Sequence, residues 1–301
     1  MFMPCYSPIT LRRDTPDEIE VPCSRCIGCL KRRQNSWGCR LSHELLFHDA
    51  IDCHFITLTY DDKNLVWASD GATLYPRHLE LFLKRLRKVH PFRYFACGEY
   101  GDKTGRPHYH LLLFGFPLDD FISYDNTYKT SDLIDHVWGH GSHNLIGSIS
   151  NESIFYCAKY VTKKAVISQV ESESRSLFKK NEWKRDAIPF RLPEFARMSR
   201  RPGIGSRFYE KFFSDIFPRG YVSLGKKEVK FAIPRYYFEK LRVSDPKMYE
   251  ILKHEQRTML EEILLDNPDS QNFQMRLNAE TVVLSRISAN SSLARTSGPG
   301  L

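Results

Sequence analysis

Hydrophobic and polar residues alternate along the first half of the chain in patterns that predict strands and helices. Residues 54–60 are rich in β-branched and aromatic side chains and precede two aspartates, so they predict a strand. Residues 92–99 and 107–116 predict two more strands, and the turn 101–105 between them allows antiparallel pairing. Residues 76–89 predict a basic amphipathic helix with proline in its first turn.

The remaining pattern is less regular but still predicts a chain that alternates between helices and strands. A fourth strand is expected at residues 144–149 and a hairpin at residues 220–233. Residues 1–22 contain four prolines and predict an extended arm, and residues after 287 predict a disordered tail. Further helices are expected at residues 30–47, 131–137, 152–170, 234–242 and 246–265.

Composition limits the class of protein. The chain has 301 residues, of which 42% are hydrophobic and 13% aromatic, as expected of a globular fold. Its longest apolar runs, such as residues 111–114, are too short to cross a bilayer, and no signal peptide pattern is found. A soluble intracellular protein is therefore expected. The net charge of +8 favours a polyanion partner, and residues 176–211 form a loop-rich stretch with ten Lys/Arg against four Asp/Glu.

Two histidines separated by one residue are the first candidate for chemistry. His108 and His110 point to the same face of their predicted strand, and Glu99 ends the strand that would pair with it. Two imidazoles and a carboxylate suit a divalent cation such as Mg²⁺ or Mn²⁺ with positions left open for substrate oxygens. The alternative is a pair of hydrogen-bonded histidines on a half-buried sheet.

Two tyrosines four residues apart are the second candidate. Tyr156 and Tyr160 lie on one face of a predicted helix, with Lys159 and Lys163 on a neighbouring stripe. A tyrosine near a metal-polarised phosphate, with a lysine that balances charge, can act as a nucleophile. The alternative is an aromatic core stripe beside a solvated basic face.

The cysteines are the third candidate. Cys23, Cys26 and Cys29 are spaced by three residues, which suits one soft metal ion, and Cys5 could complete a four-thiolate zinc site. Cys39 is an alternative fourth ligand. An iron–sulfur cluster is disfavoured because Arg33 stands where a bacterial ferredoxin has its next cysteine. Free buried thiols are the remaining alternative.

Three segments in this order resemble motifs I, II and III of the HUH rolling-circle replication initiators. They are FITLTYDD (55–62), GEYGDKTGRPHYHLLLFG (98–115) and YCAKYVTKK (156–164). The resemblance is to the initiators of small single-stranded DNA phages, the microviruses, and in particular their gokushovirus-like branch. The CSRCIGC segment and MSRRPGIGSRFYE (198–210) are also similar to that branch.

The resemblance implies an α+β fold with a central antiparallel sheet of about five strands flanked by helices, in an RRM-like arrangement. It implies that His108, His110 and Glu99 bind Mg²⁺ or Mn²⁺ and that Tyr156 and Tyr160 are the paired nucleophiles, with Lys159 between them. The expected activity is site- and strand-specific DNA nicking through a 5′-phosphotyrosine intermediate, with a 3′-hydroxyl left for a host polymerase. The expected location is the cytoplasm of an infected bacterium, without a membrane partner.

Basic residues outside these motifs are expected to contact DNA phosphates, chiefly on single-stranded DNA at an origin. Trp37, Trp183 and Phe208 are candidates for stacking on unpaired bases. No Walker A pattern is present, so unwinding is expected to need a host helicase. The candidate DNA-binding residues are Lys31, Arg32, Arg33, Lys84, Arg85, Arg200 and Arg201.

The motifs predict four parts along the chain. A Cys-rich knuckle and basic helix would occupy residues 1–50, the endonuclease domain residues 51–170, a basic extension residues 171–287, and the tail residues 288–301. Two other functions fit the same residues. One is a non-catalytic zinc-containing nucleic-acid-binding protein, and the other is a metal-dependent hydrolase that uses water as its nucleophile.

Overall fold

The fold comes from a computed structural model, which describes residues 5–16, 18–163, 188, 190–224, 229–266 and 275–285. The chain forms two compact units. The sheet unit contains residues 34–213 and 224–227, and the terminal unit contains residues 1–33, 214–223 and 228–301. The sequence suggests a different division, with boundaries at residues 50, 170 and 287, and that division into functional parts stays a prediction. None of the described helices has the length and apolar character needed to cross a membrane.

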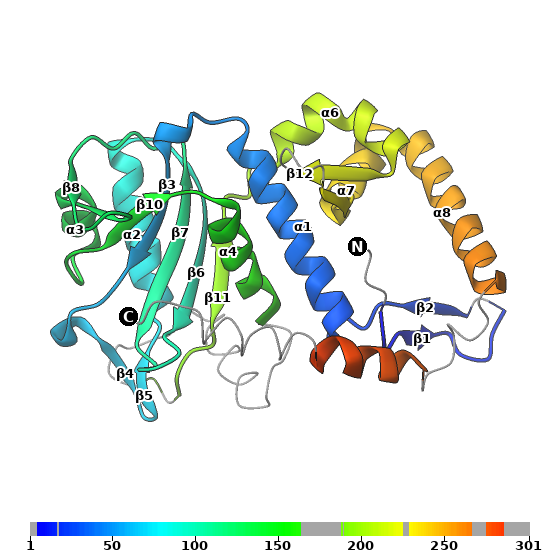
Figure 1. Cartoon of the computed structure of the whole chain (residues 1–301), viewed down its shortest axis with the longest axis horizontal. Coiled ribbons are helices and arrows are strands. Elements are labelled where there is room, and N and C mark those ends of the chain that lie inside the picture. The colour runs from blue at the N-terminus through cyan, green and yellow to red at the C-terminus, as the bar shows by residue number, and fades with distance from the viewer. Residues whose placement is uncertain are drawn as a thin grey trace. The chain divides into compact units, whose positions relative to one another are not determined.

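The sheet unit is built on one antiparallel sheet of seven strands in the order β11-β6-β7-β3-β10-β9-β8 (Figure 1). This confirms the α+β fold that the sequence predicts. The short strands β8 and β9 lengthen the sheet beyond the expected five. The strands are β3 (Cys53–Leu58), β6 (Arg93–Tyr100), β7 (Pro107–Phe114), β8 (Phe121–Ser123), β9 (Lys129–Ser131), β10 (Leu145–Ser148) and β11 (Phe195–Met198).

Helices cover both faces of this sheet, because its central strands carry apolar side chains on both sides. Leu111 and Leu113 pack with α2 (Pro76–Val89) and α3 (Asp132–Trp138). Leu112 and Phe114 pack instead with α4 (Asn151–Lys163) and with Leu41 of α1 (Ile27–Leu45). Figure 1 shows α2 and α4 on opposite faces of the sheet. The near-continuous apolar sequence LLLF of β7 is therefore divided between two cores.

A buried carboxylate joins α1 to the sheet. Glu44 is 1% exposed and accepts hydrogen bonds from the Arg93 guanidinium, from the His48 ring and, at 2.6 Å, from the backbone N–H of Gly205. Burial by itself would raise the pKa of Glu44, but these hydrogen bonds outweigh it and lower the pKa to about 2. The stretch expected to be loop-rich is more ordered than predicted, because β11 and the start of α6 (Ser206–Arg219) lie within it.

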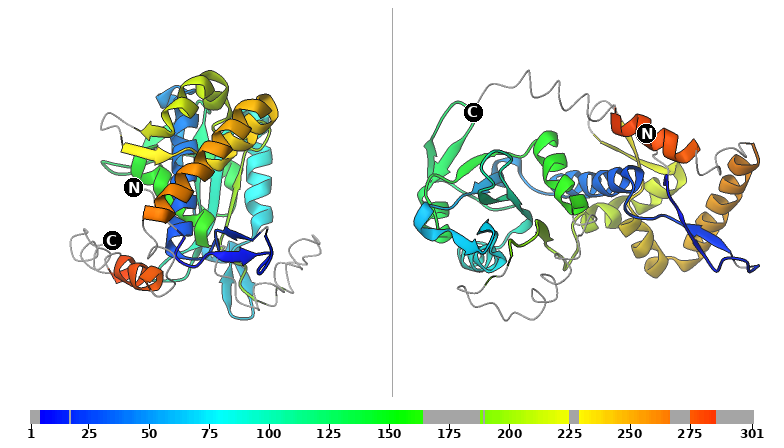
Figure 2. Two further views of the ribbon diagram at one scale, coloured as in Figure 1. Left: turned by 90° about the vertical axis from the view of Figure 1, so that its right-hand side faces the viewer. Right: turned by 90° about the horizontal axis from the view of Figure 1, so that it is seen from below.

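The terminal unit consists of shorter elements. The proline-rich arm forms the hairpin of β1 (Ile9–Leu11) and β2 (Ile19–Val21), which leads into the first turns of α1. The predicted hairpin and helices near the C-terminus are present as β12 (Tyr221–Leu224), β13 (Val229–Ala232), α7 (Arg235–Ser244) and α8 (Pro246–Asp266). Residues 275–285 form one more helix, drawn in red in Figure 2. The expected tail at residues 288–301 lies outside the described residues.

The other small elements all belong to the sheet unit. They are the hairpin of β4 (Val66–Ala68) and β5 (Gly71–Thr73) and the 3-10 helices Ala50–Asp52 and Asp62–Asn64.

Candidate functional site

The hairpin of β6 and β7 brings the predicted metal ligands together. Its turn is closed by a hydrogen bond of 3.0 Å from the N–H of Gly101 to the carbonyl of Arg106, and Gly105 takes a positive φ of 62° that glycine adopts without strain. This turn sets a register in which Glu99 is directly opposite His108. Cross-strand partners lie on the same face of a sheet, so the register alone makes Glu99 and His108 neighbours. His110, two residues on, shares that face.

One carboxylate oxygen is the centre of the site. Oε1 of Glu99 lies 2.6 Å from Nε2 of His108 and 2.7 Å from Nε2 of His110. The carboxylate is 3% exposed and His110 is 8% exposed. Burial would raise the pKa of Glu99, but the hydrogen bonds from both histidines hold it well below its usual range. Burial also lowers the pKa of His110 despite the opposing effect of Glu99.

The outer nitrogen of each histidine is already engaged. Nδ1–H of His108 donates to the carbonyl of Arg106 at 3.1 Å, and Nδ1 of His110 shares a 2.9 Å hydrogen bond with the hydroxyl of Thr57 on β3. Such outer contacts orient metal-binding histidines in proteins. They turn both Nε2 atoms toward Glu99, and one ligand atom from each residue lies within 4.8 Å of the others. The donor set and its orientation fit a divalent cation.

The sequence analysis did not identify Thr57 or the Arg106 carbonyl. Thr57 shares its strand face with Phe55, whose ring stacks on that of His110 at 5.4 Å between centroids. The alternation within β3 could have placed Thr57 on this face. Its pairing with His110 depends on the β3–β7 register, which the sequence does not give.

The two tyrosines of α4 extend from the metal-ligand group in a chain. The Tyr156 hydroxyl donates to Oε1 of Glu99 at 2.6 Å, and the Tyr160 hydroxyl donates to the Tyr156 hydroxyl at 3.0 Å. Tyr156 is 39% exposed, whereas Tyr160 is 3% exposed. Burial and the neighbouring carboxylate of Glu99 raise the pKa of Tyr156. The two residues are therefore unequal, because one borders solvent and the other is enclosed.

The position of α4 follows from its sequence. Ser150 and Ser153 form a reciprocal cap, in which each hydroxyl accepts the backbone N–H of the other residue at 3.2 and 2.9 Å. Ile154 and Cys157 then pack into the core against β6 and β7. This packing turns the face that carries Tyr156 toward Glu99.

The two lysines of α4 have different standing. Nζ of Lys159 lies 5.9 Å from the ring centroid of Tyr156 and 5.8 Å from that of Tyr160, so the structure brings it to the tyrosines. Lys163 ends α4, but its side chain lies outside the described part of the structure.

The predicted DNA-binding residues do not gather at this site. Lys84 and Arg85 lie on α2, which covers the opposite face of the sheet, and Lys84 pairs with Glu80 at 2.8 Å. The exposed Arg200 and Arg201 follow β11 beyond the residue that bonds Tyr94, roughly 17 Å along β6 from Glu99. The basic segment 31–33 belongs to the terminal unit.

The candidate stacking residues are also used elsewhere in the fold. Trp37 packs against Phe95 with 5.5 Å between ring centroids, and Phe208 stacks on His43 at 3.5 Å. Trp183 lies outside the described residues. Neither Trp37 nor Phe208 places an aromatic ring beside Glu99.

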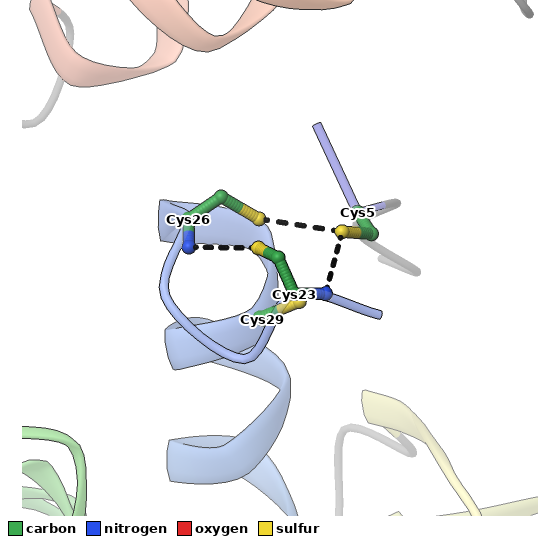
Figure 3. Close-up of side chains that lie close together, drawn as sticks. All are labelled: Cys5, Cys23, Cys26 and Cys29. Carbon is green, nitrogen blue, oxygen red and sulfur yellow. Dashed lines mark hydrogen bonds between the residues drawn. The ribbon is translucent and has the colours of Figure 1, made fainter. Parts of the chain in front are cut away.

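The four predicted cysteines form a second cluster, in the terminal unit (Figure 3). The sulfur atoms all lie within 4.8 Å of one another, and those of Cys5 and Cys26 are 3.8 Å apart. All four cysteines are free rather than disulfide-bonded. Cys39, the alternative fourth ligand, is fully buried in the α1 segment of the sheet unit and is not part of this group.

Backbone amides surround these sulfurs. Sγ of Cys23 accepts from the N–H of Cys26 at 3.3 Å and of Arg25 at 3.4 Å, and Sγ of Cys5 accepts from the N–H of Cys23 at 3.3 Å. Burial opposes the ionisation of Cys23, but the amide hydrogen bonds lower its pKa to about 7. Burial raises the pKa of Cys29 to about 12. Amide donors directed at sulfur favour thiolates, which are the form that binds metal.

Comparisons with known proteins give a consistent picture. Residues 53–165 match the family model of the replication-associated protein ORF2. The chain is 32% identical over 231 residues to "Replication-associated protein ORF2" of Spiroplasma virus 4, and 32% identical over 243 residues to "Replication-associated protein VP4" of Bdellovibrio phage phiMH2K. These alignments cover 72% and 76% of the chain and 66% and 69% of the relatives.

A third relative, "Replication-associated protein ORF4" of Chlamydia phage 1, is 30% identical over 173 residues, which are 52% of the chain and 41% of that protein. The chain thus spans about two thirds of the length of the first two relatives and less of the third. No solved structure matches the chain significantly.

Proposed function

The chain belongs to the replication-associated proteins of bacteriophages, and from that premise we propose that it starts rolling-circle DNA replication by nicking one strand at an origin. The enzyme would be an HUH tyrosine endonuclease that also rejoins strands. The observation that carries the proposal is the position of Tyr156, whose hydroxyl lies 2.6 Å from the carboxylate oxygen that both histidines contact.

Glu99, His108 and His110 would hold a Mg²⁺ or Mn²⁺ ion. When bound, such an ion supplies positive charge that polarises the scissile phosphate. The neutral imidazoles and one carboxylate leave most of that charge uncompensated. Thr57 and the Arg106 carbonyl hold the two rings, so the ligand atoms keep their orientation while the strand binds.

Tyr156 would act first. Its hydroxyl attacks the phosphorus, the bond to O3′ breaks, and the products are a 5′-phosphotyrosine link and a free 3′-hydroxyl; the proton lost by the tyrosine is balanced by the one that O3′ gains. Lys159 offsets the phosphate charge from beside both rings. Tyr156 is chosen because it is 39% exposed and contacts Glu99, whereas Tyr160 is 3% exposed and contacts the Tyr156 hydroxyl.

Tyr160 would act in the second transfer, when the regenerated origin is cut and the displaced strand is closed into a circle. Its hydroxyl is 3.0 Å from that of Tyr156, so a small movement of α4 exchanges the two nucleophiles. The substrate would be single-stranded DNA at the origin. A host polymerase would extend the 3′-hydroxyl and a host helicase would unwind the duplex, in the cytoplasm of the infected cell.

The test is a covalent-adduct assay with an origin-derived oligonucleotide and Mn²⁺. We expect an SDS-stable protein–DNA adduct with the wild-type chain, loss of more than about 1,000-fold in its initial rate for Tyr156→Phe, and a smaller loss for Tyr160→Phe. A double variant that still forms adducts would overturn the assignment. Equal losses in the two single variants would overturn the proposed order.

The same assay separates the two alternatives. A water-using hydrolase cuts the oligonucleotide and leaves no DNA on the protein. A non-catalytic binding protein retains the oligonucleotide without cutting it, and EDTA does not change that binding.

We also propose that Cys5, Cys23, Cys26 and Cys29 bind a structural zinc ion. Four thiolates at the usual Zn–S distance stand about 3.8 Å apart along the edges of a tetrahedron, which agrees with the 3.8 Å between the sulfurs of Cys5 and Cys26. Four protein ligands leave no open position, so the ion would stabilise the fold rather than take part in nicking. Metal analysis of the purified chain should find one zinc per molecule.

A further inference from the structure

We infer that the zinc-loaded cysteine cluster is the docking platform for the helix at residues 275–285, so that zinc binding fastens a C-terminal segment to the start of α1. The inference rests on the zinc proposal above and not on the nicking mechanism. It assigns a role to two features that nicking does not use, the four cysteines and this late helix (Figures 1 and 2).

The first contact is a cap on α1. Oε1 of Glu280 accepts a hydrogen bond of 3.0 Å from the backbone N–H of Ile27. Ile27 is the first residue of α1 and stands between the ligands Cys26 and Cys29. The first N–H groups of a helix lack partners within the helix, and a carboxylate at that end is favourable. Glu280 thus supplies from 253 residues away a cap that α1 does not find locally.

The second contact is apolar. Val283 packs against the small buried cluster formed by Tyr6, Cys26 and Cys29. Glu280 and Val283 are three residues apart, so both side chains lie on one face of their helix. That face therefore rests directly on residues that would bind the metal.

The third contact extends the same face toward the arm. Arg276 stands four residues before Glu280, and its guanidinium lies 3.4 Å from both carboxylate oxygens of Glu20 on β2. The Arg276 side chain is 15% exposed, so the pair is partly shielded from solvent. Arm, knuckle and late helix therefore meet through a cap, an apolar contact and an ion pair.

These contacts make the late helix depend on the metal for a physical reason. An isolated helix of eleven residues is marginal in water, so residues 275–285 need their docking surface to stay helical. That surface consists of Cys5 and Tyr6 in the arm and residues 23–29 at the start of α1, two segments that a shared ion would hold together. Without the ion their separation costs little, and the surface for Val283 is lost.

The experiment is hydrogen exchange measured by mass spectrometry on the full-length chain, with one equivalent of zinc and after removal of zinc by a chelator. We expect exchange in residues 275–285 to accelerate at least about tenfold on zinc removal and to recover when Zn²⁺ is added back. Peptides from β7 serve as the internal reference and should not change. Unchanged exchange in residues 275–285 at confirmed loss of zinc would overturn the inference.

Two variants separate the ion from the docking. Glu280→Ala should keep one zinc per chain but show the fast exchange of residues 275–285, whereas Glu255→Ala, an exposed carboxylate on α8, should behave as wild type. Cys26→Ser should lose both zinc and protection. Slow exchange in Glu280→Ala would contradict the proposed cap. Adduct formation is assayed on the same samples, so a failed docking result is distinguished from a failed nicking proposal.

Discussion

The two candidate metal sites of this chain are held together in opposite ways. Glu99, His108 and His110 project from paired strands of a seven-stranded sheet, and each histidine has a second contact that sets its orientation. The cysteines come from an arm with one short hairpin and from the beginning of a helix. Their contacts are chiefly amide hydrogen bonds to sulfur and the sulfurs themselves.

This difference separates a scaffold that organises a metal site from a metal that organises a scaffold. The sheet has cores on both faces, so its ligand atoms keep their places whether or not an ion is bound. The cysteine cluster has few apolar neighbours, among them Tyr6 and Val283. Structural metal sites of this kind contribute directly to the free energy of folding. The four predictions below test this contrast.

The largest effect is expected when the sheet-borne ligands are removed. Changing both His108 and His110 to alanine should lower the rate of adduct formation by about 10,000-fold, because the charge that polarises the phosphate is lost. The zinc content should stay at one per chain. Adduct kinetics at saturating Mn²⁺ and metal analysis measure the two quantities, with His136→Ala, an exposed histidine on α3, as the control. A double variant that works within about tenfold of wild type would show that the ion is held elsewhere.

Metal removal should affect the stability of the two regions unequally. Loss of zinc should lower the opening free energy of the β1–β2 hairpin and the start of α1 by about 4 kcal/mol, because their cross-link is gone. Removal of Mg²⁺ or Mn²⁺ should change that of β6 and β7 by less than about 1 kcal/mol. Hydrogen exchange resolves both regions in one experiment. Equal losses in both regions would remove the contrast.

The sheet unit should show an acid-sensitive anchor that is independent of either metal. The pKa of Glu44 falls from its ordinary 4.5 to about 2 in the fold, so its contribution is present above about pH 4.5 and is lost as the pH falls toward 2. That contribution is about 3 kcal/mol from the size of the shift. Urea unfolding between pH 2 and 6 should show this slope in wild type and lose it in Glu44→Gln. An unchanged slope in the variant would assign it to other carboxylates.

The smallest effect concerns the start of the tyrosine helix. Ser150→Ala removes one half of the reciprocal cap on α4 and should cost about 1 kcal/mol of unfolding free energy. Ser150→Asp keeps an acceptor for the Ser153 N–H and should restore most of it. A full loss in both variants would indicate that the serine packs rather than caps.

Local patterns in the sequence predicted much of the sheet unit. The helix at residues 76–89 was predicted with its observed bounds, because proline begins it and an amphipathic pattern continues to its end. The strands β3, β6, β7 and β10 were predicted within a few residues. The edge strand β11 was missed because it lies in a basic segment of mixed composition and gains its partner only from β6.

The candidate sites divide in the same manner. The sequence indicated the seven candidate metal and zinc ligands and the two tyrosines, because their spacing is itself the signal. It favoured Cys5 as the fourth thiolate but left Cys39 open, and the structure groups Cys5 with the other three. It also associated distant basic residues with the site, although Lys84 and Arg85 lie on the opposite face of the sheet. Charge in a sequence carries no information about which face of the fold displays it.

The sequence by itself therefore determined the fold class, the identity of the candidate ligands and nucleophiles, and the family resemblance that the comparisons support. These properties depend on residue type and on separations of a few positions, which one helix or one hairpin fixes. The tertiary structure alone decided that Tyr156 contacts Glu99 while Tyr160 is enclosed, that Thr57 holds His110, and that Glu280 caps α1. Each of these contacts joins segments far apart in the chain, and only the packing of whole elements brings them together.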